Sequence, residues 1–339
     1  MAYKFIHAAV ATNLGLVRRR NEDNYYFCGS LIKKDELSSI SSASGVFSAR
    51  SSAFAVFDGM GGFDCGDVAS RVAAQCFKDY EEELGSAKSA VDSLKGRIYQ
   101  ANDKLCSLID EIGKNMGTTI ASAAFKEDKL VIANVGDSRI YRFFEGKLEQ
   151  LTVDHTEAQS LLSSGVISEH ECMDFPFTNR LTQFIGLSPE EFLIEPHIRE
   201  IEHIQQGEKY LICSDGLYNM LDNEAIGKIL SYEKSEAQLC SELVCQAIKN
   251  GGRDNVTVMV LQVKDDSIPD IDFERTEELP PSPTAPPVTK SPALTADYAG
   301  KVADMRRTSI RYLGLLLIVS ALLIAGVAIM RHFLGDYTI

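Results

Sequence analysis

The sequence lacks the patterns that mark several large classes of protein. Its eight cysteines are scattered, with no Cys-x-x-Cys pair and no Cys/His spacing typical of a zinc site. It contains neither a GxxxxGK[ST] loop nor a GxGxxG turn after a strand, which nucleotide-binding domains use to hold phosphates. A disulfide scaffold, a zinc module and a common nucleotide-binding domain are therefore not indicated, and we expect the cysteines to be reduced thiols.

Positive charge is also scarce. The 339 residues include 34 Lys and Arg against 48 Asp and Glu, which gives a net charge of −14. Such a chain repels a phosphate backbone, so we expect no nucleic acid among its partners. The hydrophobic fraction of 45% and the charged fraction of 24% are those of a globular protein.

One long hydrophobic run lies near the C-terminus. Residues 312–330 read YLGLLLIVSALLIAGVAIM and carry no charge. As a helix rising ~1.5 Å per residue they would span roughly 28 Å, close to the thickness of the hydrocarbon core of a bilayer. A buried core helix is the alternative. Only Arg331 follows the run, whereas four basic residues precede it: Lys301, Arg306, Arg307 and Arg311.

The positive-inside rule places the N-terminal side of this predicted transmembrane helix in the cytoplasm. We therefore expect a single-pass, tail-anchored protein of the cytoplasmic (inner) membrane, with a short tail at 331–339. Residues 265–311 are first acidic and then proline-rich, a composition that cannot bury a core, and they are predicted to be a disordered linker. The globular domain is predicted to cover residues 1–264.

The pattern of apolar residues in this domain predicts a mixed fold. Apolar residues at helical spacing predict helices over 67–84 and 87–112, and a serine-rich stretch at 30–52 is interpreted as a long hairpin loop. Short runs rich in Val, Ile and Phe are expected to be strands, several joined by hairpins: 54–57, 118–125, 130–134, 139–144, 209–214 and 255–263. Hairpins together with separate long helices favour antiparallel sheets with helices packed outside, an α+β class.

Aspartates recur beside the apolar runs. Asp58, Asp137, Asp215 and Asp254 each adjoin such a run next to glycine or another polar residue, and Asp23 lies in RRRNEDNYY. Any one of them can be explained as a turn residue. Strands would carry them together to the edge of a sheet, where a cluster of carboxylates must either repel or share cations. Oxygen ligands without His or Cys select Mg²⁺ or Mn²⁺, and two such ions can activate a water for phosphoryl transfer.

Eight short motifs follow one another along this domain: RRRNED, FAVFDGMGG, MGTTI, ANVGDSRIY, LTVDHT, LTQFIG, ICSDGL and GGRDNVTV. This series resembles the protein phosphatase 2C family of metal-dependent Ser/Thr protein phosphatases, and above all its compact bacterial members. The resemblance implies an α-β-β-α sandwich of two antiparallel sheets flanked by helices. It also implies two divalent metal ions, Mn²⁺ or Mg²⁺, at one edge of the sandwich, with a possible weak third ion.

Carried over by position, the resemblance implies a role for each aspartate. Asp58 would bridge both ions, and the Gly59 carbonyl would ligate one of them. Asp215 and Asp254 would complete the other site. Asp137 matches the family position associated with the third, weaker ion.

Further residues are implied around the ions and the substrate. Asp23, helped by Glu22, would hold metal-bound waters, and Asn255 follows Asp254 as in the family pattern. Arg18 would bind the substrate phosphate with its guanidinium fork. The implied reaction is direct attack of a metal-bridging hydroxide on phosphoserine or phosphothreonine, with no covalent phosphoenzyme.

The expected substrates are phosphorylated proteins, and the expected setting is opposition to a bacterial Ser/Thr protein kinase at the membrane. A catalytically impaired phosphoprotein-binding or scaffolding module is the alternative. Three departures from the family pattern give it weight: Phe63 replaces a usual His, Asn219 a frequent Asp, and Gln183 a frequent Arg. We predict that the neutral Asn219 weakens the third metal site. The retained metal-binding aspartates favour an active enzyme.

Overall fold

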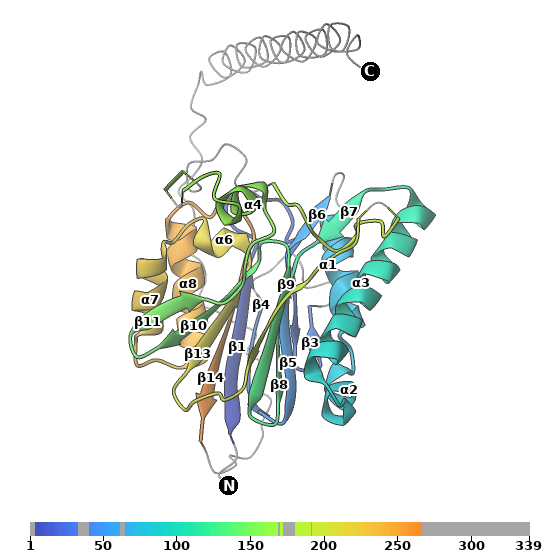
Figure 1. Ribbon diagram of the computed structural model, residues 1–339. Coiled ribbons are helices and arrows are strands. Elements are labelled where there is room, and N and C mark those ends of the chain that lie inside the picture. The colour runs from blue at the N-terminus through green and yellow to red at the C-terminus, as the bar shows by residue number, and fades with distance from the viewer. Residues whose placement is uncertain are drawn as a thin grey trace, which may run out of the picture. The chain divides into compact units, whose positions relative to one another are not determined.

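The computed structural model describes residues 4–32, 41–61, 65–168, 170–171, 180–190 and 192–265 (Figure 1). The chain separates into two compact units, Met1–Pro281 and Ser282–Ile339, and the described residues all belong to the first. The predicted membrane helix at 312–330, the tail, nearly all of the predicted linker and Phe63 lie outside the described ranges. Within those ranges, no helix is both long enough and apolar enough to cross a bilayer.

The first six-stranded sheet consists of β1 (Phe5–Asn13), β4 (Ser41–Ser48), β10 (Arg139–Phe144), β11 (Lys147–Gln150), β13 (Lys209–Cys213) and β14 (Val256–Lys264). Its order is β11-β10-β13-β14-β1-β4, and all neighbours are antiparallel. The start and the end of the domain meet in this sheet, because β14 pairs with β1 along its whole length.

The second six-stranded sheet consists of β2 (Asn24–Phe27), β3 (Ser30–Leu31), β5 (Ser51–Phe57), β8 (Ile120–Lys126), β9 (Lys129–Val135) and β12 (His197–Ile201). Its order is β12-β9-β8-β5-β2-β3, again antiparallel throughout. A small ribbon of β6 (Gly59–Gly61) and β7 (Met116–Thr118) adjoins the end of β5 and the start of β8.

Helices cover the outer face of each sheet (Figure 1). The second sheet is covered by α1 (Gly66–Cys76), α2 (Tyr80–Ser86) and α3 (Ala90–Ile112). The first sheet is covered by α6 (Asp215–Tyr218), α7 (Asn223–Leu230) and α8 (Glu236–Lys249). A third apolar core fills the space between the sheets. The central strands are thus buried on both faces, which explains the nearly continuous apolar run VTVMVLQVK of β14. The predicted α-β-β-α sandwich is confirmed.

Three predicted elements need correction. The helix expected over 67–84 is two helices, because Asp79 adopts a left-handed φ of 60° that ends α-helical geometry. The strand expected over 118–125 is interrupted at Thr119, since β7 and β8 belong to different sheets. Within the expected loop at 30–52, β4 pairs with β1 at the edge of the first sheet, where its half-exposed face accommodates serine.

Candidate functional site

Five aspartates meet at one end of the sandwich, each at the end or the beginning of an element. Asp58 follows β5, Asp137 lies between β9 and β10, Asp215 begins α6, Asp254 precedes β14, and Asp23 precedes β2. Asp23 and Asp137 are buried, whereas the other three are partly exposed. Each of the other four carboxylates acts electrostatically on Asp58, so the structure brings all five predicted aspartates together.

Burial and mutual repulsion raise the pKa values of four of these carboxyl groups. Burial, and then the charges of Asp23 and Asp215, raise the pKa of Asp58 well above its usual value. Burial, with neighbouring carboxylates as a further cause, raises the pKa of Asp23 to about 7, that of Asp137 to about 7 and that of Asp215 to about 6. The ionised cluster therefore carries more negative charge than its surroundings offset, and bound cations would supply the missing positive charge.

The main chain around Asp58 is held by the junction between β7 and β8. The Asp58 N–H donates to Thr119 Oγ1 at 3.0 Å. The Asp58 carbonyl accepts from Thr118 Oγ1 and from the Thr119 N–H, at 2.9 Å each. At Gly59 a Cβ atom would overlap the carbonyl oxygen of Gly66, so glycine alone fits between β5 and α1. These contacts fix the direction in which the Asp58 side chain leaves the sheet.

Asp23 connects the two sheets. Its Oδ2 accepts hydrogen bonds from Ser214 Oγ at 2.8 Å and from Thr257 Oγ1 at 2.7 Å. Thr257 lies in β14 of the first sheet, while Asp23 directly precedes β2 of the second. One oxygen of this buried carboxylate is therefore already engaged by the protein.

Arg18 lies beside the cluster on a segment that Asn255 anchors. Arg18 Nη2 is 2.6 Å from Asp254 Oδ2, and half of the Arg18 side chain is exposed. The hydrogen bond to Asp254 raises the pKa of Arg18, and burial raises that of Glu22. Asn255 Oδ1 accepts from the Glu22 N–H at 2.8 Å, and its Nδ2 donates to two carbonyls of the same segment. Asn255 thus ties Arg18 and Glu22 to the start of β14.

The chemistry of this donor set suits a hard divalent cation. Carboxylate oxygens dominate it, which matches the ligand preference of Mg²⁺ and Mn²⁺. In the part of the chain that the structure describes, no three Asp, Glu, His or Cys side chains are already arranged as ligands of one ion. Protein donors occupy two of the carboxylates, because Asp254 pairs with Arg18 and Asp215 accepts from Asn219 Nδ2 at 2.9 Å. A cation would therefore share these two carboxylates with their protein donors.

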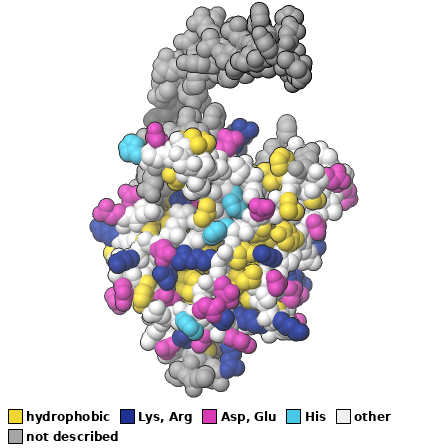
Figure 2. All heavy atoms as spheres, viewed as in Figure 1, with side chains coloured by type: hydrophobic (Ala, Val, Ile, Leu, Met, Phe, Trp, Pro, Cys, Tyr) yellow, Lys and Arg dark blue, Asp and Glu magenta, His cyan; other side chains and the backbone are white. Residues whose placement is uncertain are grey.

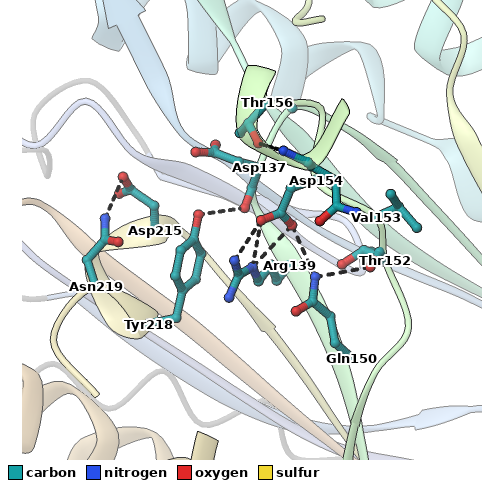
Figure 3. Close-up of polar contacts among 12 residues, drawn as sticks. Asp137, Arg139, Gln150, Thr152, Val153, Asp154, Thr156, Asp215, Tyr218 and Asn219 are labelled. Carbon is teal, nitrogen blue, oxygen red and sulfur yellow. Dashed lines mark hydrogen bonds and ion pairs between the residues drawn. The ribbon is translucent and has the colours of Figure 1, made fainter. Parts of the chain in front are cut away.

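A second polar cluster adjoins Asp137 and Asp215 (Figure 3). Arg139 donates from Nη2 and Nε to Asp154 Oδ2, at 2.6 and 3.0 Å, and its guanidinium carbon lies 3.6 Å from the centre of the Tyr218 ring. Tyr218 in turn donates its hydroxyl to the Asp137 carbonyl at 2.9 Å. Sequence reasoning missed Arg139, Asp154 and Tyr218. The available signal was that the first two lie within the motifs ANVGDSRIY and LTVDHT.

The segment around α4 (Glu157–Ser163) is fastened near the carboxylates. The His155 N–H donates to the Gly136 carbonyl at 2.9 Å, and the Gly136 N–H donates to His155 Nδ1 at 3.2 Å. Farther along the chain, Thr118 and Ile185 exchange main-chain hydrogen bonds of 3.0 and 2.8 Å. Gly136 directly precedes Asp137, and Thr118 donates its hydroxyl to the Asp58 carbonyl, so this segment and the cluster share a support.

The two departures from the family pattern that the structure describes are both engaged in hydrogen bonds. Asn219 holds Asp215 from the end of α6. Gln183 Oε1 accepts from the Glu195 N–H at 2.7 Å and so serves the local loop. Asn219 is thus the one of these two in direct contact with a predicted ligand.

Cys65 and Arg71 happen to have the Cys-x5-Arg spacing of Cys-dependent phosphatases. Here the residues after Cys65 form helix α1, Cys65 is buried, and Arg71 pairs with Asp67 on the same helix at 3.6 Å. The geometry excludes a thiol-based site at this position.

Charges of both signs are interspersed on the face shown in Figure 2. The acidic excess of the sequence does not form one continuous field there. Long-range attraction by a single-sign surface is therefore not indicated on this face, and recognition of a charged group depends on the site itself.

Comparison with known proteins agrees with this arrangement. The model of the protein phosphatase 2C family matches residues 35–244. The serine/threonine phosphatase stp of Listeria welshimeri is 32% identical over 262 residues, covering 76% of this chain and 96% of that protein. The structure of the Mycobacterium tuberculosis serine/threonine phosphatase PstP/Ppp superposes with a TM-score of 0.64 at 26% identity, covering 77% of this chain and 99% of the other.

A structure of the catalytic domain of PstP in complex with two manganese ions superposes with a TM-score of 0.63, also at 26% identity and over 77% and 99% of the two chains. The family match covers more than half of the chain, and the stp relative is matched over nearly its whole length. The chain therefore belongs to the protein phosphatase 2C family.

Proposed function

We propose that the protein is a metal-dependent protein phosphatase that hydrolyses phosphoserine and phosphothreonine on proteins. The observation that carries the proposal is the convergence of five aspartates from five separate connections beside the half-exposed guanidinium of Arg18. The fold is that of a family whose relatives are named serine/threonine phosphatases. One of their structures holds two manganese ions.

Two divalent ions, Mn²⁺ or Mg²⁺, would be held by Asp58, the Gly59 carbonyl, Asp215 and Asp254. Asp137 would contribute to a weaker third position. Such ions supply the acidity that turns water into a nucleophile at neutral pH and the positive charge that phosphoryl transfer needs. The pKa values raised by mutual repulsion support this assignment, because a cation removes the cause of that repulsion.

The remaining residues of the site position water and substrate. Asp23 already accepts two hydroxyl hydrogen bonds at one oxygen, which orients it as a holder of ordered water, with Glu22 beside it. Arg18 is half exposed and carries a planar fork suited to a phosphate. Asn255 positions Arg18 and Glu22 through the main chain of their segment.

We further propose that residues 1–264 form the catalytic domain, that 265–311 link it to a membrane helix at 312–330, and that the domain faces the cytoplasm. The uncharged run at 312–330 and the excess of basic residues before it support this topology. An anchor concentrates the enzyme near membrane-bound substrates. A Ser/Thr protein kinase and its phosphorylated targets at the membrane are the partners that this placement favours.

The experiment is phosphate release from a phosphothreonine peptide by the full-length protein, with Mn²⁺ and with excess chelator. Turnover that the chelator abolishes, and that Asp58→Asn lacks while remaining folded, is the expected result. Equal turnover by the wild type and Asp58→Asn would refute the metal assignment. A folded wild type that binds Mn²⁺ and the phosphopeptide without turnover would instead identify a phosphoprotein-binding module.

A further inference from the structure

Tyr218 links two chain segments that each carry an aspartate of the cluster. It lies in α6, which Asp215 begins, and its hydroxyl donates to the main-chain carbonyl of Asp137 at 2.9 Å. Asp137 lies in the connection between β9 and β10, 81 positions before Tyr218 in the sequence. Figure 3 shows the phenol directed from α6 toward Asp137. This hydrogen bond therefore sets where the Asp137 main chain lies relative to Asp215.

The Tyr218 ring is held in turn by Arg139. The guanidinium carbon is 3.6 Å from the ring centre, a close cation–π contact. The guanidinium cannot easily turn away from the ring, because Nε and Nη2 both donate to Asp154. Gln150 Nε2 also donates to Asp154, at 3.1 Å. The planar face of Arg139 is thus fixed against the ring.

Asn219, the next residue after Tyr218, holds Asp215, the second of the two aspartates. Its Nδ2 donates to Asp215 Oδ2 at 2.9 Å, so the last residue of α6 and the residue that caps this helix hold the two aspartates. Asp137 and Asp215 carry like charges and repel each other when both are ionised. A tether between their segments opposes that separation.

We propose that Tyr218, oriented by the Arg139–Asp154 pair, is a positioning residue that sets the spacing of Asp137 and Asp215 for the weakest of the bound cations. The inference rests on the proposed function, because it concerns a cation that this function requires. In this role Tyr218 would be neither a metal ligand nor a substrate contact. It acts through the main chain of Asp137.

The test measures Mn²⁺ binding to the purified full-length protein by titration calorimetry, together with the Mn²⁺ dependence of phosphopeptide hydrolysis. Tyr218→Phe keeps the ring beneath Arg139 and removes only the hydroxyl. We expect it to raise the dissociation constant of the weakest Mn²⁺-binding step about tenfold and to leave the tighter steps unchanged. Mutation of residues that orient metal ligands usually lowers metal affinity by about this factor. The Mn²⁺ concentration for half-maximal activity should rise by the same factor.

Tyr141→Phe is the matched control, because it also removes a phenol hydroxyl that contacts Arg139 but has no bond to Asp137. We expect Mn²⁺ binding within twofold of the wild type. If Tyr218→Phe binds Mn²⁺ as the wild type does, or if Tyr141→Phe shows the same weakening, the positioning role is refuted. Should Tyr218→Phe not fold, Arg139→Lys replaces it, since lysine keeps the charge but loses the fork and the planar face, and the same weakening is expected.

The wild-type titration separates this inference from the proposed function. A wild type that binds no Mn²⁺ would refute the metal-dependent phosphatase, and the positioning role with it. A wild type that binds Mn²⁺ with an unchanged Tyr218→Phe titration would refute the positioning role alone.

Discussion

Arg18 and Asp254 are 236 positions apart in the sequence, yet they form an ion pair of 2.6 Å beside the aspartate cluster. The pair joins the residue proposed to bind the substrate phosphate to a residue proposed to bind metal. Arg18 and a cation therefore compete for the same carboxylate. When a cation takes Asp254, we expect the guanidinium to become available to the phosphate of the substrate.

This competition gives the first prediction. Arg18→Ala removes the proposed contact with the substrate phosphate. It also removes the guanidinium that competes with Mn²⁺ for Asp254. We expect the KM for a phosphothreonine peptide to rise about tenfold, because a charge-assisted bidentate contact is lost, while the Mn²⁺ concentration for half-maximal activity falls. Steady-state kinetics over a matrix of peptide and Mn²⁺ concentrations measure both. Arg19→Ala, an exposed neighbour, is the control, and an equal KM for all three proteins would contradict the role of Arg18.

The second prediction concerns stability without metal. Asp58→Asn removes a carboxylate that burial and four neighbouring charges destabilise in its ionised form. In excess chelator we expect its thermal midpoint to exceed that of the wild type by about 2–4 °C, the shift that about 1 kcal/mol produces in a domain of this size. Added Mn²⁺ should stabilise the wild type and not the variant, by linkage of binding to folding. Scanning calorimetry measures both, and a lower midpoint for Asp58→Asn in chelator would contradict the repulsion.

The third prediction concerns Asn219. Its amide occupies Asp215 Oδ2, and the family often has Asp at this position. Asn219→Asp replaces that donor by a carboxylate, so we expect tighter binding of the weakest Mn²⁺ by about tenfold. The wild type should accordingly need a higher Mn²⁺ concentration for half-maximal activity than the variant. Titration of activity with Mn²⁺ compares the two, and superimposable curves would count against a role for this position.

The fourth prediction follows from His155. Burial, with the nearby His197 as a second cause, lowers the pKa of His155 from 6.5 to about 4. Between these values the unfolded chain binds a proton that the folded protein does not, so the free energy of unfolding falls as the pH drops from about 7 to 4. His155→Asn keeps an acceptor for the Gly136 N–H and removes the titrating ring. Between pH 7 and 4 we expect the free energy of unfolding of His155→Asn to fall by about 1–2 kcal/mol less than that of the wild type.

Urea unfolding at a series of pH values measures the difference. Subtraction of the two profiles cancels the contribution of every other titrating group that the substitution leaves unchanged. Parallel profiles for the wild type and His155→Asn would show that His155 titrates alike in the folded and unfolded chains.

Four of the five aspartates could be located from sequence because each adjoins an apolar run whose strand carries it to the end of a sheet, whereas Asp23 was found through the motif RRRNED. The same strands predicted antiparallel sheets with helices outside, and the resemblance to the family implied the sandwich. The break at Asp79 could not be anticipated, since the apolar spacing of a helix continues across it and only the left-handed backbone interrupts it. β4 was missed because an edge strand tolerates serine, which in a sequence is typical of a loop.

The cluster around Tyr218 escaped prediction for a different reason. Its contacts join residues from three distant segments, and each alone reads as an ordinary core or surface residue. The family motifs marked Arg139 and Asp154 without revealing that they pair. Long-range hydrogen bonds of this kind depend on the tertiary arrangement, which local patterns do not encode.

The last strand of the domain lies in the middle of its sheet, between β13 and β1, and Asp254 stands at its entry. Because the chain is synthesised from its N-terminus, β1 cannot pair with β14 until residue 264 has left the ribosomal exit tunnel. Because the proposed metal ligand Asp254 is among the last residues of the domain, we expect a nascent chain to be inactive until synthesis of the domain is nearly finished. A transcript truncated shortly before position 254 would yield an inert polypeptide with unpaired edges on β1 and β13, a substrate for chaperones and proteases rather than an uncontrolled enzyme.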